Sequence, residues 1–119
     1  MATPEGQILN AILDYLAFNK IWHRRMNTGA IKTEKRFFRF GSPGMADVLA
    51  IVSRHLVGVT SEGDDWQGWV PHPVWIEVKT TKGQQSLAQL SFEEEVSKEG
   101  HGYLVARSIE DVENYIRSL

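Results

Sequence analysis

The chain has 119 residues with a net charge of −2 at pH 7, and 42% of its residues are hydrophobic and 24% charged. These values are ordinary for a soluble globular protein, and the length suits one domain with one core over residues 1–119. Cys is absent, which excludes disulfides, thiolate nucleophiles and Cys-based zinc sites. No apolar run approaches the ~18 residues of a membrane span. The start "MATPEGQ" lacks the basic and apolar regions of a signal peptide, so we expect a cytoplasmic protein with no membrane partner.

The first predicted element is a helix that begins after Thr3. Thr3 is a favourable N-cap, Pro4 is tolerated at the first helical position, and Glu5 favours the positive end of the helix dipole. Glu5 also projects from the core-facing side of the helix, so it is interpreted equally well as a dipole-stabilising or a functional carboxylate. Apolar residues recur at helical spacing until the predicted end near residues 19–20, at Ile8, Leu9, Ile12, Leu13 and Leu16.

Four strands are predicted next, separated by turns rich in Gly, Pro and Asn. The loop "GSPG" precedes the third strand, which is apolar and carries Asp47 near its beginning. Residues 60–73 are polar and rich in Gly and Pro, which predicts an exposed hairpin loop before the fourth strand. Trp66 and Trp69 flank that loop and either form a small cluster that stiffens it, pack on a dimer mate or stack on an unpaired base. The four predicted strands cover residues 21–31, 35–40, 46–53 and 74–81.

The C-terminal third predicts two helices around one strand. Ser86 with Gln89 forms a capping-box pattern, and Gly100 is a typical stop for the helix that follows. The apolar residues of this helix are Leu87, Leu90, Phe92 and Val96. Residues 101–107 predict a fifth strand, and Ser108 with Asp111 begins a last helix. The predicted order is therefore helix, four strands, helix, strand, helix, which is typical of an α/β fold.

The basic residues are concentrated in one segment. Residues 20–39 contain seven Lys or Arg against Glu34, a charge of +6, so the remainder of the chain carries −8. Such a segment is either a phosphate-binding surface or a solvated charged face. Phosphate contacts fix position without reading sequence, so this surface would favour selectivity for the structure of a nucleic acid. The residues chosen as phosphate contacts are Arg24, Arg25, Lys35, Arg36 and Arg39.

A group of charged residues on the third and fourth predicted strands could carry chemistry. Glu77 and Lys79 lie two positions apart and face the same side of their strand. Adjacent strands lie ~4.8 Å apart, so Asp47 can approach Glu77, and the two carboxylates repel unless a cation lies between them. Mg2+ suits such a pair, and Lys79 beside it could orient a water for phosphodiester hydrolysis. Glu and Lys at this spacing are also common on solvated strands, so the surrounding pattern matters more than the pair.

Taken in order, these segments resemble the PD-(D/E)XK nuclease superfamily and, within it, the VRR-NUC family of small stand-alone nucleases, many of them phage-encoded. The resemblance covers nearly the whole chain and implies a restriction-endonuclease-like αβββαβ core, with a mixed sheet flanked by helices. The family usually has Pro directly before the Asp, where this chain has Ala46, a difference that affects loop geometry more than ligand chemistry. The matching pieces are the leading helix with Glu5, "RRMNTGA", "RFGSPGMAD", "IEVKTTKG" and "SLAQLSF".

The resemblance implies a DNA endonuclease that depends on Mg2+, for which Mn2+ can substitute, and needs no small-molecule cofactor. Asp47 and Glu77 would bind the metal together with the Val78 backbone carbonyl. Glu5 would extend to the same metal directly or through water. Lys79 would position the attacking water. Gln89 matches a Gln that supports the active site in the family, an interpretation that competes with its capping role.

The resemblance to the stand-alone members of the family also implies a homodimer that acts on branched DNA, such as four-way (Holliday) junctions. A homodimer also suits a small chain, because two symmetric cuts need two sites. If the chain is phage-encoded, it would act in the cytoplasm of the host cell. Two alternatives stay open: another PD-(D/E)XK endonuclease, restriction-type or directed to flaps or nicks, and a non-catalytic DNA-binding subunit.

Overall fold

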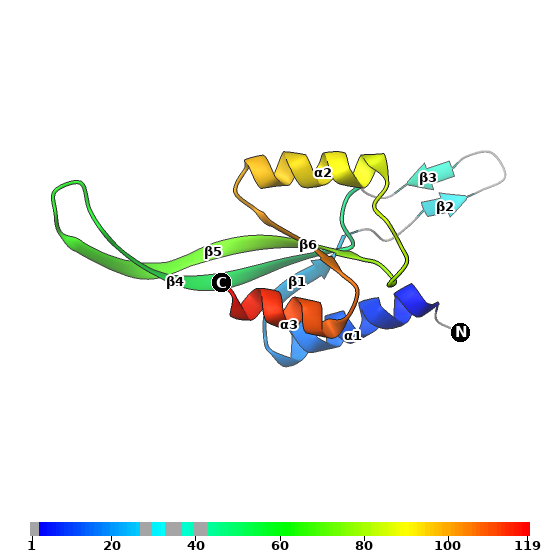
Figure 1. Cartoon of the computed structure of the whole chain (residues 1–119), viewed down its shortest axis with the longest axis horizontal. Helices are drawn as coiled ribbons and strands as arrows, with labels where there is room; N and C mark the ends of the chain where they lie inside the picture. The colour runs from blue at the N-terminus through cyan, green and yellow to red at the C-terminus, as the bar shows by residue number, and fades with distance from the viewer. Residues whose placement is uncertain (1–2, 27–29, 33–36, 40–42) are drawn as a thin grey trace.

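The protein is described by a computed structural model that covers residues 3–26, 30–32, 37–39 and 43–119. A four-stranded sheet forms the centre, with α2 on one face and α1 and α3 on the other (Figure 1). No helix in the described ranges is long and apolar enough to cross a membrane. The helices are α1 (Pro4–Phe18), α2 (Leu87–Lys98) and α3 (Ile109–Arg117). The strands are β1 (Trp22–Arg25), β2 (Ala30–Lys32), β3 (Phe37–Arg39), β4 (Val48–Val59), β5 (Asp65–Val78) and β6 (Gly102–Ala106).

The central sheet is mixed, with the strand order β1-β4-β5-β6. β1 pairs antiparallel with β4, β4 antiparallel with β5, and β5 parallel with β6. The crossover from β5 to β6 carries α2, as a parallel connection requires. The α/β class with a mixed sheet and flanking helices is confirmed. The segment predicted over residues 21–31, as a strand that turns at residues 27–29, contains two strands: β1 lies in the central sheet, whereas β2 pairs with β3. The predicted turn lies outside the described residues.

The helix boundaries follow the capping residues that the sequence predicts. The Thr3 hydroxyl accepts from the Gly6 amide at 3.0 Å, and the Ser108 hydroxyl accepts from the Asp111 amide at 3.3 Å. Ser86 heads a complete capping box at the start of α2. Gly100 has a φ of +80°, the left-handed conformation that ends many helices and that favours Gly.

The hydrophobic core lies between the sheet and the helix pair α1 and α3. Alternate residues of β4 and β5 point to this side and meet the apolar stripe of α1. The opposite face is covered more thinly, since α2 has no buried residue and packs mainly through Phe92, whose ring meets Trp75 edge-on at 5.0 Å. The core residues are Leu9, Ile12, Leu16, Val48, Ala50, Val74, Ile76, Val78, Ala106 and Val112.

The prediction of a hairpin loop over residues 60–73 is wrong in its extent, because β5 already begins at Asp65. β4 and β5 pair continuously from Val48–Ile76 to Val59–Asp65 and form a long arm, residues 54–70, that projects beyond the helices (Figure 1). Pro71 and Pro73 are tolerated in this strand because β6 begins opposite Val74, so that this stretch of β5 pairs only with β4.

Candidate metal centre

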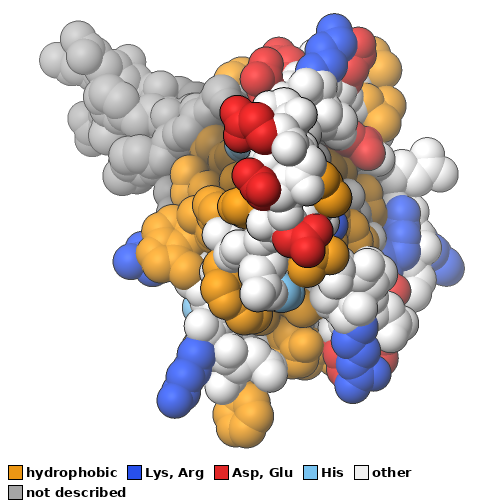
Figure 2. Space-filling view, turned by 90° about the vertical axis from the view of Figure 1, so that its left-hand side faces the viewer, with side chains coloured by type: hydrophobic (Ala, Val, Ile, Leu, Met, Phe, Trp, Pro, Cys, Tyr) orange, Lys and Arg blue, Asp and Glu red, His pale blue; other side chains and the backbone are white. Residues whose placement is uncertain are grey.

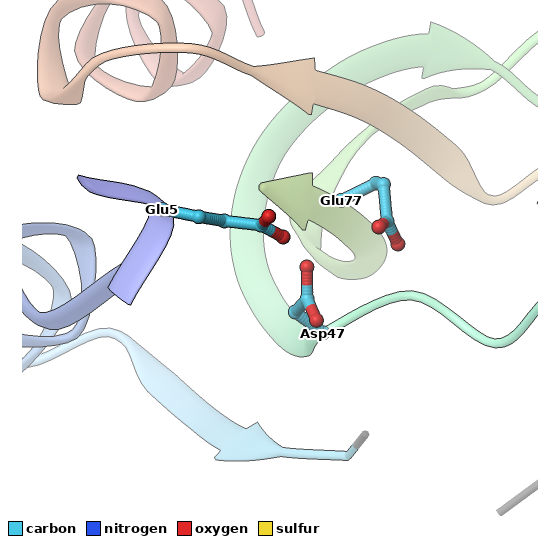
Figure 3. Close-up of side chains that lie close together, drawn as sticks. All are labelled: Glu5, Asp47 and Glu77. Atoms are coloured by element: carbon cyan, nitrogen blue, oxygen red, sulfur yellow. The ribbon is translucent and has the colours of Figure 1, made fainter. Parts of the chain in front are cut away.

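Three carboxylates from distant parts of the chain converge at one end of the central sheet. Glu5 lies in the first turn of α1, Asp47 directly precedes β4, and Glu77 is next to last in β5. Because Val48 is paired with Ile76 in an antiparallel register, Asp47 lies opposite Glu77. One oxygen from each carboxylate lies within 4.8 Å of the others, and Figure 3 shows Glu5 reaching from its helix toward the other two.

Glu77 is the most deeply buried member of the group, with 2% of its surface exposed. Its Oε1 accepts from the Gln89 side-chain amide at 2.9 Å and lies 3.7 Å from the Lys79 ammonium. Its Oε2 is buried and has no hydrogen-bond partner among the described residues. A buried carboxylate oxygen without a donor costs free energy that a cation would recover. The unpartnered oxygen and the three carboxylates together fit a divalent metal ion.

The electrostatics of the group also favour a cation. Burial, reinforced by the Asp47 carboxylate, raises the pKa of Glu77 to about 8, although the Lys79 ammonium opposes the rise. Burial likewise raises the pKa of Asp47, against the lowering effects of the Val78 amide and of Lys79. Both shifts have one cause, since negative charge is confined here with little water. A divalent ion bound here would lower both pKa values again, because it would stabilise the ionised form of each carboxylate.

Two hydrogen bonds with backbone amides hold Asp47 in position. Its Oδ2 accepts from the Val78 amide at 2.8 Å, which ties the start of β4 to the end of β5. Its own carbonyl accepts from the Met26 amide at 2.8 Å. Ala46, directly before Asp47, is fully buried. Asp47 is therefore anchored to the ends of both β1 and β5.

Gln89 makes both the capping contact and a contact with the acidic group through its one side-chain amide. Its side-chain oxygen accepts from the Ser86 amide at 2.9 Å, which completes the capping box. Its side-chain nitrogen donates to Glu77 at 2.9 Å. The two ends of one amide therefore join the start of α2 to the acidic group.

Gly44 sets the distance between the loop before Asp47 and α2. Its φ of +78° is a conformation that L side chains rarely adopt, and a Cβ there would collide with the Ala88 carbonyl. Gly44 is therefore in close backbone contact with the first turn of α2, a role that the pattern of turn residues alone does not reveal.

Lys79 extends from the end of β5 beside Glu77, and its own amide donates to the Ala106 carbonyl at 3.0 Å. The turn after it is closed by Arg107, whose Nη1 donates to the Thr80 carbonyl at 2.5 Å and to the Gly83 carbonyl at 2.7 Å. A Cβ on Gly83 would lie 3.3 Å from Lys79 Cδ, so this turn is the wall against which the lysine stem packs. Arg107 is not predicted from the sequence, because it follows a strand that bears none of the acidic residues.

A second hydrogen-bond network, which no sequence pattern predicts, lies between α2 and β6. The Gln85 side-chain nitrogen donates to Glu93 at 3.1 Å and to the Tyr103 hydroxyl at 3.2 Å. Burial, with the nearby negative charge of Glu77, raises the pKa of Tyr103 to about 12. Tyr103 therefore stays a neutral hydrogen-bonding group beside the acidic residues.

A hollow of about 200 Å³ opens beside the acidic group. Its lining includes Glu5, Asp47, Val78 and the exposed Arg25. One of the predicted phosphate contacts, Arg25, therefore shares a surface with three of the four predicted metal ligands.

The other predicted phosphate contacts are less well placed by the structure. Arg24 is exposed, and its guanidinium stacks 4.7 Å from the centre of the Trp22 ring. Lys35 and Arg36 lie outside the described residues, and Arg39 is described only as the last backbone position of β3. The predicted basic surface is therefore described only at Arg24 and Arg25.

No protein-family model matches the chain, and neither a curated protein nor a solved structure matches it significantly. The fold and the site therefore define the class of protein on their own. It is an α/β protein with a mixed sheet, at one end of which three carboxylates and an ammonium group converge.

Proposed function

We propose that the protein is a metal-dependent endodeoxyribonuclease of the VRR-NUC type that uses Mg2+ or Mn2+. One observation carries the proposal: Glu5, Asp47 and Glu77 converge, the buried Oε2 of Glu77 lacks a donor, and the Lys79 ammonium lies 3.7 Å from Oε1 of the same carboxylate. A structural ion pair would account for Lys79 and Glu77, but it would not require two further carboxylates at the same place.

The order of elements supports the proposal. α1, β1, β4, β5, α2 and β6 follow one another in the order of a restriction-endonuclease-like αβββαβ core, and β2 with β3 forms a separate insertion. In that core the acidic residue of the middle strand and the E-x-K group of the next strand share one end of the sheet. Asp47, Glu77 and Lys79 have this arrangement here.

Each residue has a role in the proposed reaction. Asp47, Glu77 and Glu5, with the Val78 carbonyl, would hold the metal, which when bound would polarise the scissile phosphate and acidify a water. The Lys79 ammonium would orient the attacking water and stabilise the charge that develops on the phosphate. Gln89 would keep the Glu77 carboxylate turned so that Oε2 stays available.

The partners follow from the resemblance and from the basic segment. DNA would be the substrate, four-way junctions the preferred form, and a homodimer the active species. Arg24 and Arg25, together with Lys35, Arg36 and Arg39, would contact phosphates. If the chain is phage-encoded, these reactions would take place in the host cytoplasm.

A cleavage assay tests the proposal. The purified chain is incubated with supercoiled plasmid and with duplex, nicked, flap and four-way substrates, in Mg2+, Mn2+ or chelator. We expect metal-dependent nicking and preferred cleavage of four-way DNA, which Glu77→Gln abolishes. Glu94→Gln is the matched control, because Glu94 is an exposed carboxylate on α2 paired only with Lys98.

The outcomes separate the rival functions. Cleavage of one duplex sequence would indicate a restriction-type enzyme, and preference for flaps or nicks would indicate a repair-type relative. DNA binding without cleavage in either metal would indicate a non-catalytic subunit. Cleavage by Glu77→Gln at the wild-type rate would refute the assignment of the site.

A further inference from the structure

The two edges of the arm differ in what they offer to another chain. Within the described residues β1 pairs with β4 only as far as Ile51, and β6 pairs with β5 only from Val74 onward. Beyond these residues one long edge of the arm belongs to β4 and the other to β5. An open strand edge is a row of amides and carbonyls to which an extended segment can add as a further strand.

Three hydrogen bonds show which backbone groups point outward from the arm. The Thr60 amide donates to the Asp64 carbonyl across the arm at 2.7 Å, so even-numbered residues bond within it. The Lys79 amide donates outward to β6, and the Asp47 carbonyl accepts outward from the residue after β1. Strand pairing is continuous between these points, so the alternation holds along the whole arm. Odd-numbered residues of the arm therefore turn their amides and carbonyls to its edges.

The β5 edge is blocked by two prolines. Pro71 and Pro73 are odd-numbered, so the amides that they lack would face this edge. A strand added there would find no donor at two successive outward positions. Proline at such positions is a common protection of an edge strand against unwanted pairing.

The β4 edge has no such protection. Its outward residues all keep their amides, because none of them is proline. Val57 and Val59 are 76% and 67% exposed, although β-branched residues are typical of covered strands. The edge accommodates an extended segment of about seven residues. Its outward residues are Ser53, His55, Val57 and Val59.

The two tryptophans of the arm hold this edge in shape. Trp66 lies over the glycines of one face, where a Cβ on Gly68 would lie 3.1 Å from its ring. Trp69 lies on the other face, with its ring centre 5.1 Å from that of His55, and is 72% exposed. Both rings pack along the arm itself, which agrees with the stiffening role that is one of the predictions from the sequence. A preformed edge lowers the entropy cost of docking.

A hollow of about 560 Å³ lies at the root of the β4 edge, where β1 gives way to the open part. Trp22 and Val52 line it from opposite faces of the sheet, so it opens at the edge itself. Ile21 and Ile116 add apolar surface, and Lys20 supplies a positive charge. A large apolar side chain at the end of a docked strand would therefore have a place to bind.

The charges along this edge set the direction of a docked strand. The tip carries Glu62, Asp64 and Asp65, and Figure 2, which views the molecule from this end, shows acidic side chains gathered there. A strand antiparallel to β4 begins at the acidic tip and ends at the hollow, so its α-carboxylate would meet Lys20. A parallel strand would place that carboxylate beside the acidic tip, where it would be repelled.

We propose that the β4 edge binds an extended segment at the C-terminus of another protein, antiparallel to β4. The segment has basic residues toward its start, where it passes the acidic tip, and a large apolar last residue, which enters the hollow. Its backbone bonds to the outward groups of β4 supply affinity, while the hollow and Lys20 select the last residue and its carboxylate. This docking site is independent of the proposed nuclease function, and its tests need no cleavage.

Peptide selection tests the site with a defined probe, a library of ten-residue peptides displayed with free C-termini. The peptides are selected on the wild-type chain and counter-selected on Val57→Pro. This substitution removes an outward amide from the β4 edge and leaves the hydrogen bonds between β4 and β5 intact. We expect the enriched peptides to carry Lys or Arg early and Leu, Ile, Phe or Trp as the last residue.

Gln67→Pro is the matched control, because Gln67 is the cross-strand partner of Val57 and its amide faces the β5 edge. We expect an enriched peptide to bind Val57→Pro roughly tenfold more weakly, and Gln67→Pro as tightly as the wild type. Lys20→Ala, or amidation of the peptide, should weaken binding roughly two- to fivefold, as loss of an exposed ion pair does. Circular dichroism and thermal melting check that both proline variants fold.

Amide hydrogen exchange on the wild-type chain gives a second test that needs no variant. The outward amides of β4 exchange readily without a partner, whereas the even-numbered amides are already protected by β5. A bound peptide should therefore slow exchange at the outward amides of β4 and leave Gln67 and Trp69, on the β5 edge, unchanged.

Three results overturn the proposal. The first is a selection that yields no peptide able to distinguish the wild type from a folded Val57→Pro. The second is protection of Gln67 and Trp69 by the bound peptide in place of the β4 amides. The third comes from sedimentation velocity without peptide: a wild-type dimer that Val57→Pro dissociates would assign the β4 edge to a second copy of the chain.

Discussion

The side-chain amide of Gln89 donates to Oε1 of Glu77 at 2.9 Å, and it is the contact that connects α2 to the acidic group. Because the other end of the same amide completes the capping box at Ser86, the position of the helix and the orientation of the carboxylate depend on one side chain. A rotation of the Glu77 carboxylate would therefore break this hydrogen bond or disturb the amide that caps α2.

Gln89→Glu separates the two roles. Glu preserves the capping box, but it cannot donate to Glu77 and places a further negative charge beside it. We expect cleavage or metal affinity to fall by roughly 10- to 100-fold, as for other residues that orient metal ligands. Metal titrations and cleavage rates measure the effect. Ser86→Ala is the complementary variant: it removes the cap, should lower stability, and should leave the metal affinity nearly unchanged.

Metal binding should release protons. Because burial and Asp47 raise the pKa of Glu77 to about 8, the metal-free carboxyl is largely protonated at pH 7 and must lose its proton to bind a cation. Calorimetric titration with Mg2+ or Mn2+ in buffers of different ionisation enthalpy measures the number released. Glu77→Gln should abolish the binding, and equal heats in all buffers would argue against a protonated ligand.

The stability of the metal-free protein should fall as the pH rises. The pKa of Glu77 is about 8 in the folded chain against a usual value of 4.5, so between these values the folded state holds a proton that the unfolded state has released. The contribution of this group is complete below about pH 4.5 and is lost as the pH passes 8. Urea unfolding in chelator from pH 5 to 8.5 measures the trend, which Glu77→Gln should flatten.

Arg107 should act as a positioning residue for Lys79. Its two hydrogen bonds close the turn from Thr80 to Gly83 against which the lysine stem packs. If the proposed function holds, Arg107→Ala should lower kcat by about tenfold with little change in KM, as loss of an orienting group does. Added guanidinium should restore part of the rate. A loss of stability with an unchanged kcat would limit Arg107 to a structural role.

Arg25 should contribute to DNA affinity through a phosphate contact. It is exposed and lines the same hollow as Asp47 and Glu5. Arg25→Ala should weaken binding to all DNA sequences alike and reduce the slope of log affinity against log salt by about one. Binding titrations from low to moderate salt measure the slope, with Arg117→Ala, at the end of α3, as the control. An unchanged slope would exclude Arg25 from the interface.

Local patterns predicted the starts of the helices correctly, because each start depends on a side chain within three residues of the backbone that it caps. Thr3, Ser86 and Ser108 accept from the predicted first turns. The approach of Asp47 to Glu77 was also predictable, since the pairing of two adjacent strands leaves little freedom in register.

The arm was not predictable from composition. Gly, Pro and charged residues between positions 60 and 73 are typical of a loop, yet strand pairing with β4 continues through most of them. Pro71 and Pro73 become tolerable only because β6 is short and leaves β5 with a free edge there. That condition belongs to the sheet as a whole, and no local pattern contains it.

The sequence by itself determined which residues have the chemistry to hold a cation, because carboxylates, amides and caps act through their own functional groups. Only the tertiary structure decided that Glu5 joins Asp47 and Glu77, that Gln89 serves two partners, and that Arg107 closes the turn beside Lys79. The physical reason is that these contacts join elements far apart in the chain, so the packing of α1, α2 and β6 against one sheet brings them together.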